Sequence, residues 1–171
     1  MFQDEARFGR ISDPRYCWAK KPLRPVIKAM LTHQYTYAYG AVSPAHGRFD
    51  SLGLPRVNSR CMQYLMDEIA PRYRQENIIR VVDGAGWHRA AFKLPDTLRL
   101  HFLPPYSPEL KPQEHSGDEL REKFFHNPVF DRLDALEDPL VKGLPALEAN
   151  HEPVMSIANW PWIINITSNA N

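Results

Sequence analysis

Two short apolar segments that lead into acidic residues most constrain the fold of this chain. The segment FQDE places Asp4 after an apolar start, and IIRVVDGAGWH places Asp83 directly after a run that suits a buried strand. Open α/β sheets carry their sites at the carboxyl ends of such strands. A third acid, Glu114, begins a predicted helix after LPPYSPELKPQ. The pattern predicts three carboxylates gathered from two strand ends and one helix.

Alternating strand and helix signals predict a mixed α/β sheet with helices on its faces. YTYAYGAV (35–42) and GRFDSLGL (47–54) are rich in residues that favour strands, and PAHG between them predicts an antiparallel hairpin. Residues 78–82 suit a strand covered on both faces, and residues 98–103 predict another strand. Little sequence precedes Asp4, so we expect the strand that carries it to be short or cut off.

Helical signals follow the hairpin. Asn58 is a suitable N-cap for a helix whose apolar residues recur at helical spacing, and Pro71 should end that helix near Ala70. Residues 113–126 predict a second helix. Leucines from Leu133 to Leu147 predict a last helix, which we expect to be interrupted by Pro139, Gly143 and Pro145. The aromatic segment WPWII (160–164) should pack back on the core.

The charges of the chain are unevenly distributed. The formal net charge is only +1, but residues 1–103 contain 16 Lys or Arg against nine Asp or Glu, and residues 104–171 contain five against 11. The excess of positive charge in residues 1–103 could bind a polyanion. The densest basic segment has no acid and includes a tryptophan that could stack on a nucleic acid: Arg15, Trp18, Lys20, Lys21, Arg24, Lys28. A solvated loop is the alternative interpretation.

Cysteine usage argues against structural zinc. Cys17 and Cys61 are isolated, without the C-x-x-C spacing of a zinc site, and two lone thiols fit a reducing compartment. No apolar run approaches the roughly 18 residues of a membrane helix. The N-terminus also lacks the features of a signal peptide. We therefore expect a cytoplasmic protein with no membrane partner.

Hard carboxylate oxygens at one site predict binding of Mg²⁺ or Mn²⁺. Two such ions can clamp the attacking and leaving oxygens of a phosphodiester. Strand side chains alternate faces, so only one of Asp4 and Glu5 can point into the site, and periodicity alone does not decide which. Each acid taken singly is an ordinary turn or first-turn residue, and His88 alone is an ordinary helix-start residue. The prediction rests on the three segments together.

Three segments carry a family resemblance, in this order: FQDEARFGR, VVDGAGWHRA and LHFLPPYSPELKPQEH. With them, the chain resembles the catalytic domain of bacterial insertion-sequence transposases of the mariner-related DDE superfamily. The resemblance covers roughly residues 1–165 and implies a ribonuclease H-like fold. It implies metal-dependent nicking and strand transfer of DNA at transposon ends, in a nucleoid-associated bacterial protein, and it leaves a homodimer open. Asp4, Asp83 and Glu114 match the three catalytic acids that hold two Mg²⁺ or Mn²⁺ ions. His88 matches an auxiliary histidine, and Asp118 lies one helical turn after Glu114.

The chain departs from the family pattern in its third motif. Lys111 stands where the family has asparagine, and Ser116 and Gly117 stand where it prefers an apolar residue and a tryptophan. The family's N-terminal helix-turn-helix region is not found, so we expect residues 1–171 to be a single catalytic domain. Besides a purely structural interpretation, in which all three acids are surface capping residues, two functional alternatives remain. One is a decayed remnant that at most binds DNA, and the other is a ribonuclease H-type hydrolase, which activity on RNA–DNA hybrids would reveal.

Overall fold

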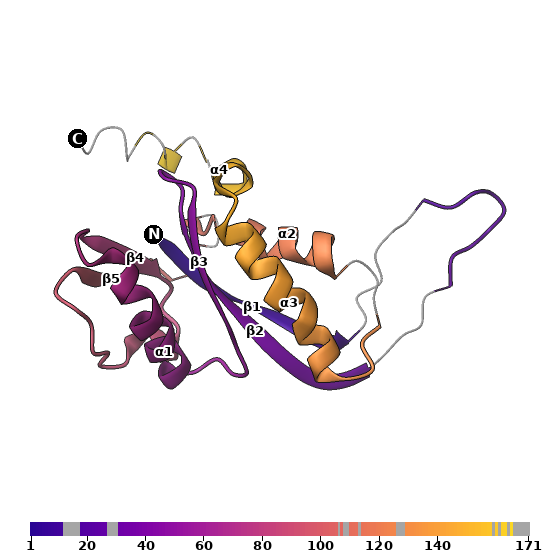
Figure 1. The fold of residues 1–171 in the computed structure, drawn as a ribbon, viewed down its shortest axis with the longest axis horizontal. Helices are drawn as coiled ribbons and strands as arrows, with labels where there is room; N and C mark the ends of the chain where they lie inside the picture. Colours follow the sequence, from indigo (N-terminus) through magenta and orange to yellow (C-terminus); the bar gives the residue numbers. More distant parts are fainter. Residues whose placement is uncertain are drawn as a thin grey trace.

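A five-stranded mixed sheet runs through the centre of the molecule in the computed structural model (Figure 1). The structure describes residues 1–11, 18–26, 31–105, 107, 110–112, 114–125, 129–158, 160, 162–163 and 165. The strands are β1 (Phe2–Ile11), β2 (Leu31–Ser43), β3 (Arg48–Leu54), β4 (Ile78–Val82) and β5 (Leu98–Phe102). Their order across the sheet is β3-β2-β1-β4-β5. The predicted mixed α/β architecture is confirmed.

Both kinds of strand pairing meet at β1. The strands β1, β2 and β3 form an antiparallel meander, and the predicted hairpin joins β2 to β3. On its other side, β1 pairs in parallel with β4, which in turn pairs in parallel with β5. Asp83 therefore follows the carboxyl end of a parallel strand, as predicted.

The expectation that Asp4 stands at the end of its strand is wrong. β1 has 10 residues, so Asp4 lies near its beginning rather than at its end. Its length follows from its neighbour, because β2 has 13 residues and pairs with β1 from Phe2 as far as Ile11. Alternate side chains of β1, including Ala6 and Phe8, also join an apolar core. A partner strand and a core that extend well past Asp4 keep the backbone extended.

The first helix forms as predicted. Asn58 accepts a hydrogen bond from the Cys61 backbone N–H at 2.9 Å, which caps α1 (Ser59–Ile69). Pro71 lies in the short 3₁₀ helix η1 (Ala70–Tyr73) that follows directly. The buried residues of α1 pack on one face of the sheet around Val82. A second 3₁₀ helix, η2 (Gly86–Arg89), follows β4.

The second face of the sheet is covered by α2 (Glu114–Phe124), α3 (Leu133–Glu148) and α4 (His151–Ala158) (Figure 1). The expected interruption of the last long helix is wrong, since α3 contains both Pro139 and Pro145. A proline inside a helix costs about 3 kcal/mol. Four leucines of α3 are buried, and each contributes about 1.5–3 kcal/mol: Leu136, Leu140, Leu144, Leu147. Burial of this apolar side outweighs the two prolines.

The exposure of β4 and the packing of the aromatic segment also bear on the sequence predictions. Ile79 on β4 is 60% exposed, so the prediction of a strand covered on both faces is wrong for this position. In the aromatic segment, the Trp162 ring lies edge-on to the Phe2 ring with centroids 6.3 Å apart, and Ile163 is buried. The described part of that segment therefore packs on the core, as expected. None of the described helices combines the length and the apolar character needed to cross a membrane.

Candidate functional site

The register of β1 against β4 brings Asp4 and Asp83 together. Phe2 of β1 pairs with Val81 of β4, and the two acids follow these partners by two residues each. Their carboxylates share one cation, because Lys111 Nζ lies 3.3 Å from Asp4 Oδ2 and 2.8 Å from Asp83 Oδ2. Two of the three predicted acids thus converge on one point, and Asp4 rather than Glu5 is the member of its pair that meets Asp83 through this cation.

Lys111 is enclosed at this point. Its side chain is 14% exposed and arises from the segment between β5 and α2. Burial alone would lower the pKa of the Lys111 ammonium, but its hydrogen bond to Asp83 and the charge of Asp4 raise that pKa above its ordinary value. Burial raises the pKa of Asp4 despite the opposing charge of Lys111. The ammonium therefore stays charged and neutralises part of a crowded acidic site.

The other oxygen of Asp83 is held by protein groups. Asp83 Oδ1 accepts hydrogen bonds from the Ala85 backbone N–H at 3.0 Å and from His88 Nδ1 at 2.7 Å. Burial would raise the pKa of Asp83, but the hydrogen bond from Lys111 and these further contacts lower it below its ordinary value. The Asp83 carboxylate is therefore ionised and fixed in orientation.

His88 is buried between two carboxylates from different elements. Its Nε2 lies 2.9 Å from Glu5 Oε1, while its Nδ1 meets Asp83. A carboxylate oxygen within hydrogen-bond distance of each ring nitrogen favours the doubly protonated, charged form of the ring. Burial alone would lower the pKa of His88, but the hydrogen bond to Glu5 and the charges of Glu5 and Asp83 raise it.

Glu5 has two more partners besides His88. It accepts hydrogen bonds from Gln3 Nε2 at 2.7 Å and from Trp87 Nε1 at 3.2 Å. The motif residues Trp87 and His88 thus tie the turn after β4 to β1. Glu5 and Lys111 are the two members of this cluster that the sequence did not assign to the site. The only sequence signals for them were the adjacency of Glu5 to Asp4 and the departure of Lys111 from the family pattern.

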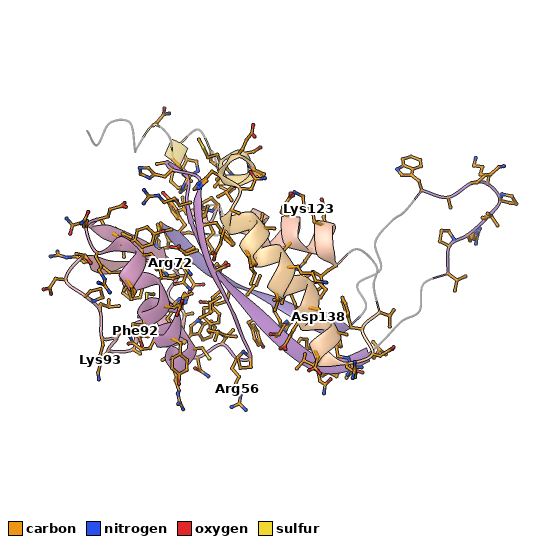
Figure 2. All side chains as sticks on the ribbon, in the orientation of Figure 1. Arg56, Arg72, Phe92, Lys93, Lys123 and Asp138 are labelled. Atoms are coloured by element: carbon orange, nitrogen blue, oxygen red, sulfur yellow. The ribbon has the colours of Figure 1, made fainter. Side chains whose placement is uncertain are left out.

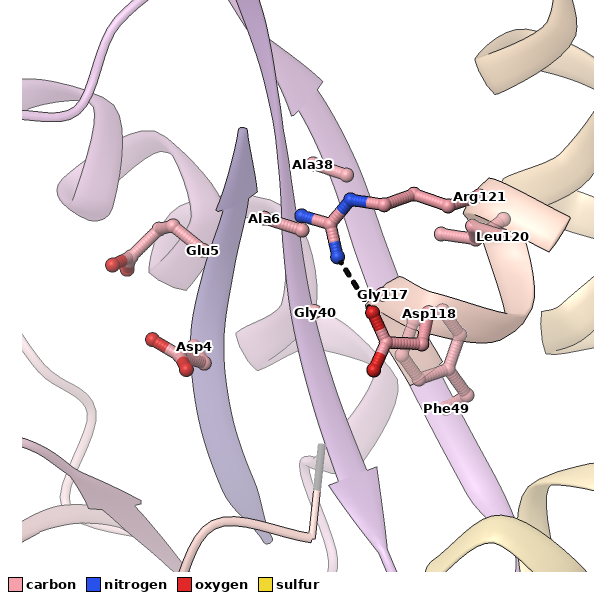
Figure 3. Close-up of a pocket in the computed structure, with 10 residues that line it drawn as sticks. All are labelled: Asp4, Glu5, Ala6, Ala38, Gly40, Phe49, Gly117, Asp118, Leu120 and Arg121. Carbon is pink, nitrogen blue, oxygen red and sulfur yellow. Dashed lines mark hydrogen bonds and ion pairs between the residues drawn. The ribbon is translucent and has the colours of Figure 1, made fainter. Parts of the chain in front are cut away.

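The third predicted acid begins α2, and its side chain lies outside the described part of the structure. The first turn of α2 nevertheless packs against β1, since a Cβ placed on Gly117 would lie 3.3 Å from the Ala6 Cβ. Asp118 does not join Asp4 and Asp83. It is 62% exposed and forms an ion pair with Arg121 at 3.0 Å (Figure 3). The auxiliary role predicted for Asp118 has no support in these contacts.

Two cavities are each lined by one acid of the Asp4–Asp83 pair. The first, of about 260 Å³, lies between β1 and α2 and is lined by Asp4, Gly117 and Asp118 (Figure 3). The second, of about 410 Å³, lies beside Asp83 and is lined by Lys111, Arg89 and the paired prolines Pro104 and Pro105. The second cavity combines two cationic side chains with an acid, which suits an anionic group that must lie close to a carboxylate.

The predicted basic segment extends away from the body of the molecule. Residues 18–26 are all exposed, including Trp18, Lys20, Lys21 and Arg24, and they lie beyond the carboxyl end of β1 (Figure 1). Figure 2 shows the side chains of this segment standing clear of the helices and strands. Arg15 and Lys28 lie outside the described residues. We refer to residues 18–26 as the basic arm.

The chemistry of the Asp4–Asp83 pair fits a divalent cation. Both groups present hard oxygens to one point, and the Lys111 ammonium already stands there as a monovalent substitute. Among the side chains that the structure describes, no group of three or more His, Cys, Asp or Glu is arranged to hold a metal ion. A third ligand would therefore have to come from elsewhere, and Glu114 at the start of α2 is the predicted one.

Comparisons with known proteins agree with the sequence motifs. Residues 1–137 match the family described as DDE superfamily endonuclease. The uncharacterized protein y4pE/y4sA of Sinorhizobium fredii (strain NBRC 101917 / NGR234) is 32% identical over 130 residues, which are 75% of this chain and 96% of that protein. The family match includes the segments that carry Asp4, Asp83 and Glu114.

Solved structures of Mos1 share the fold. The Mos1 strand transfer complex has a TM-score of 0.55 at 15% identity. The match covers 93% of this chain and 54% of the Mos1 chain. The Mos1 transposase paired-end complex with the left transposon end has a TM-score of 0.55 at 16% identity. That match covers 93% of this chain and 55% of the Mos1 chain. The chain spans about half the length of these Mos1 chains. This likeness confirms the ribonuclease H-like fold, and the family match shows that the chain belongs to the DDE superfamily endonucleases.

Proposed function

We propose that this chain is a transposase catalytic domain that nicks DNA and transfers the freed strand in a reaction that requires divalent metal. The observation that carries the proposal is the convergence of Asp4 and Asp83 on one cation at the meeting point of β1 and β4. Family membership over residues 1–137 supports the endonuclease chemistry. We also propose DNA as the partner, a cytoplasmic location at the nucleoid, and residues 1–171 as one catalytic unit.

The metal would be Mg²⁺ or Mn²⁺, held by Asp4 and Asp83 with Glu114 as the proposed third ligand. Mos1 paired-end complexes have been solved with Mn and with Mg, which supports this choice for the present chain. Such ions, when bound, supply charge stabilisation to the phosphoryl oxygens and lower the pKa of a bound water. Carboxylate oxygens are the ligands that both ions prefer.

The protein groups around the pair have roles that follow from their contacts. His88 and the Ala85 N–H hold Asp83 Oδ1, which fixes the direction of Oδ2. Arg89 and Lys111 line the cavity of about 410 Å³ beside Asp83, where a phosphate group would meet two cations. The basic arm is the proposed contact for the DNA backbone outside the site.

Nicking of supercoiled plasmid DNA tests the proposal. The chain should convert supercoiled to open-circular DNA with Mg²⁺ or Mn²⁺ and should not do so with EDTA. Asp83→Asn and Glu114→Gln serve as blanks, and both should abolish nicking if these acids act as proposed. Equal nicking by the wild type and both blanks would contradict the site. Cleavage of the RNA strand of an RNA–DNA hybrid, without nicking of DNA, would instead support the ribonuclease H-type alternative.

One observation favours a second candidate function, a remnant that binds DNA without cutting it. Lys111 stands where the family has asparagine, and its ammonium occupies the point on which the two acids converge. The helix that carries Glu114 also has Gly117 facing a cavity. DNA binding by the basic arm without metal-dependent nicking would support this candidate over the first.

A further inference from the structure

Both oxygens of Asp83 accept hydrogen bonds from protein groups. Oδ1 accepts from His88 Nδ1 at 2.7 Å and from the Ala85 N–H at 3.0 Å, and Oδ2 accepts from Lys111 Nζ at 2.8 Å. The groups on Oδ1 are fixed, because His88 is buried and is also held by Glu5. Lys111 is the one flexible side chain among these donors, so Oδ2 is the oxygen that can be released to another cation.

The same ammonium also holds Asp4. Its distance of 3.3 Å to Asp4 Oδ2 places Nζ between the two carboxylates. A cation that binds both acids through their Oδ2 atoms would have to occupy nearly the same position. Two cations cannot share that space, and their charges repel strongly at such separations.

We propose that Lys111 is a resident cation that a divalent metal must displace before Asp4 and Asp83 can both bind it. This inference rests on the proposed metal site and adds a residue that sets its affinity. The displaced ammonium has a place to go, because Lys111 also lines the cavity of about 410 Å³ that it shares with Arg89. A phosphate group in that cavity would offer it a new partner of opposite charge.

Displacement makes a direct prediction for metal affinity. Lys111→Met keeps the length and apolar stem of the side chain and removes the competing charge, so Mn²⁺ should bind at least tenfold more tightly than to the wild type. Lys142→Met is the matched control, because Lys142 is an exposed residue of α3 and its replacement removes the same formal charge. Isothermal titration with MnCl₂, after removal of metal by EDTA, measures all three dissociation constants, with Asp83→Asn as the blank.

A second measurement uses the wild-type chain and needs no variant. Acetylation of lysines by acetic anhydride, followed by peptide mass spectrometry, should find Lys111 protected in the metal-free protein. Saturating Mg²⁺ should increase its modification several-fold, while modification of exposed Lys142 stays constant. This readout keeps the proposal testable if Lys111→Met fails to fold, and Lys111→Asn provides a further variant for the titration.

The possible results separate the two proposals. Tighter Mn²⁺ binding by Lys111→Met, together with Mg²⁺-dependent exposure of Lys111, supports displacement. Equal affinities for the wild type and Lys111→Met, or protection of Lys111 that Mg²⁺ leaves unchanged, would overturn displacement and leave the metal site standing. Absence of Mn²⁺ binding to every variant would overturn the metal site itself and displacement with it.

Discussion

His88 Nε2 lies 2.9 Å from Glu5 Oε1, and this contact joins the central strand β1 to the turn that carries Asp83. The two carboxylates that contact His88 come from positions 78 residues apart in the chain. Both contacts are charge-assisted, which makes them stronger than hydrogen bonds between neutral groups. The orientation of Asp83 therefore depends on a residue of β1 that does not itself face the shared cation.

Neutralising Glu5 should destabilise the protein. Glu5→Gln keeps the size of the side chain but weakens its charge-assisted hydrogen bond to His88, and we expect a loss of about 1.5–3 kcal/mol in the free energy of unfolding. Urea denaturation measures this loss. Glu68→Gln, on the exposed side of α1, is the control and should change stability by less than about 0.5 kcal/mol. Equal effects of the two variants would show that Glu5 contributes only as a surface charge.

The metal-free protein should lose stability as pH rises above neutrality. The pKa of His88 is raised in the folded state, so its stabilising contribution is complete below the ordinary value near 6.5 and is lost as pH rises through the folded pKa. Melting temperatures in EDTA between pH 6 and 9 test this for the wild type and His88→Asn. The difference between the two proteins should narrow at high pH. A constant difference would mean that His88 is not charged in the fold.

Asp50 should be necessary for stability because it faces a buried guanidinium. Arg80 is fully buried, and none of its three guanidinium nitrogens has a hydrogen-bond partner among the described residues. Its Nη2 lies 3.6 Å from Asp50 Oδ2. Asp50→Asn removes the opposing charge and should cost about 3–5 kcal/mol. Adding Arg80→Met should recover much of this loss, since no buried cation then remains. A double variant as unstable as Asp50→Asn would locate the defect in the Tyr73–Asp50 hydrogen bond instead.

Filling the cavity beside α2 should stabilise the chain. Ser116→Leu combined with Gly117→Trp restores the residue types that the family prefers and directs a large side chain toward the cavity of about 260 Å³. Cavity filling of this kind commonly adds about 0.5–2 kcal/mol, and we expect metal-dependent nicking to rise with it. Thermal unfolding and plasmid nicking are the measurements. Gly117→Ala is the control that adds only the Cβ, so it combines the helix propensity of about 1 kcal/mol with the contact to Ala6. A lower melting temperature in the double variant would show that Ala6, at 3.3 Å from the new Cβ, cannot move aside.

Removing cations from the basic arm should weaken the salt dependence of DNA binding. Lys20, Lys21 and Arg24 are exposed, and their joint replacement by alanine should flatten the plot of log affinity against log salt by about three units. Fluorescence anisotropy with a labelled duplex at several salt concentrations gives the slope. Lys93→Ala, at an exposed position before β5, should leave it almost unchanged. If the triple variant keeps the wild-type slope, the arm does not contact phosphates.

The features that the sequence predicted correctly depend on local chemistry. Asn58 caps α1 through a neighbour three residues away, and Asp83 follows a short apolar strand whose end is marked by Gly84. The length of β1 and the continuity of α3 through Pro139 depend on packing partners that are distant in the chain. The bridge from Lys111 to Asp4 spans 107 residues, so no local pattern could reveal it.

The long first strand also sets a spacing on any duplex bound to this protein. Ile11 lies seven positions after Asp4, and strands rise about 3.3 Å per residue, so β1 places about 23 Å between the acid and the carboxyl end of the strand. Base pairs in B-form DNA are stacked about 3.4 Å apart. If the proposed DNA runs along β1, a duplex that contacts both Asp4 and the carboxyl end of this strand spans about seven base pairs between the two points.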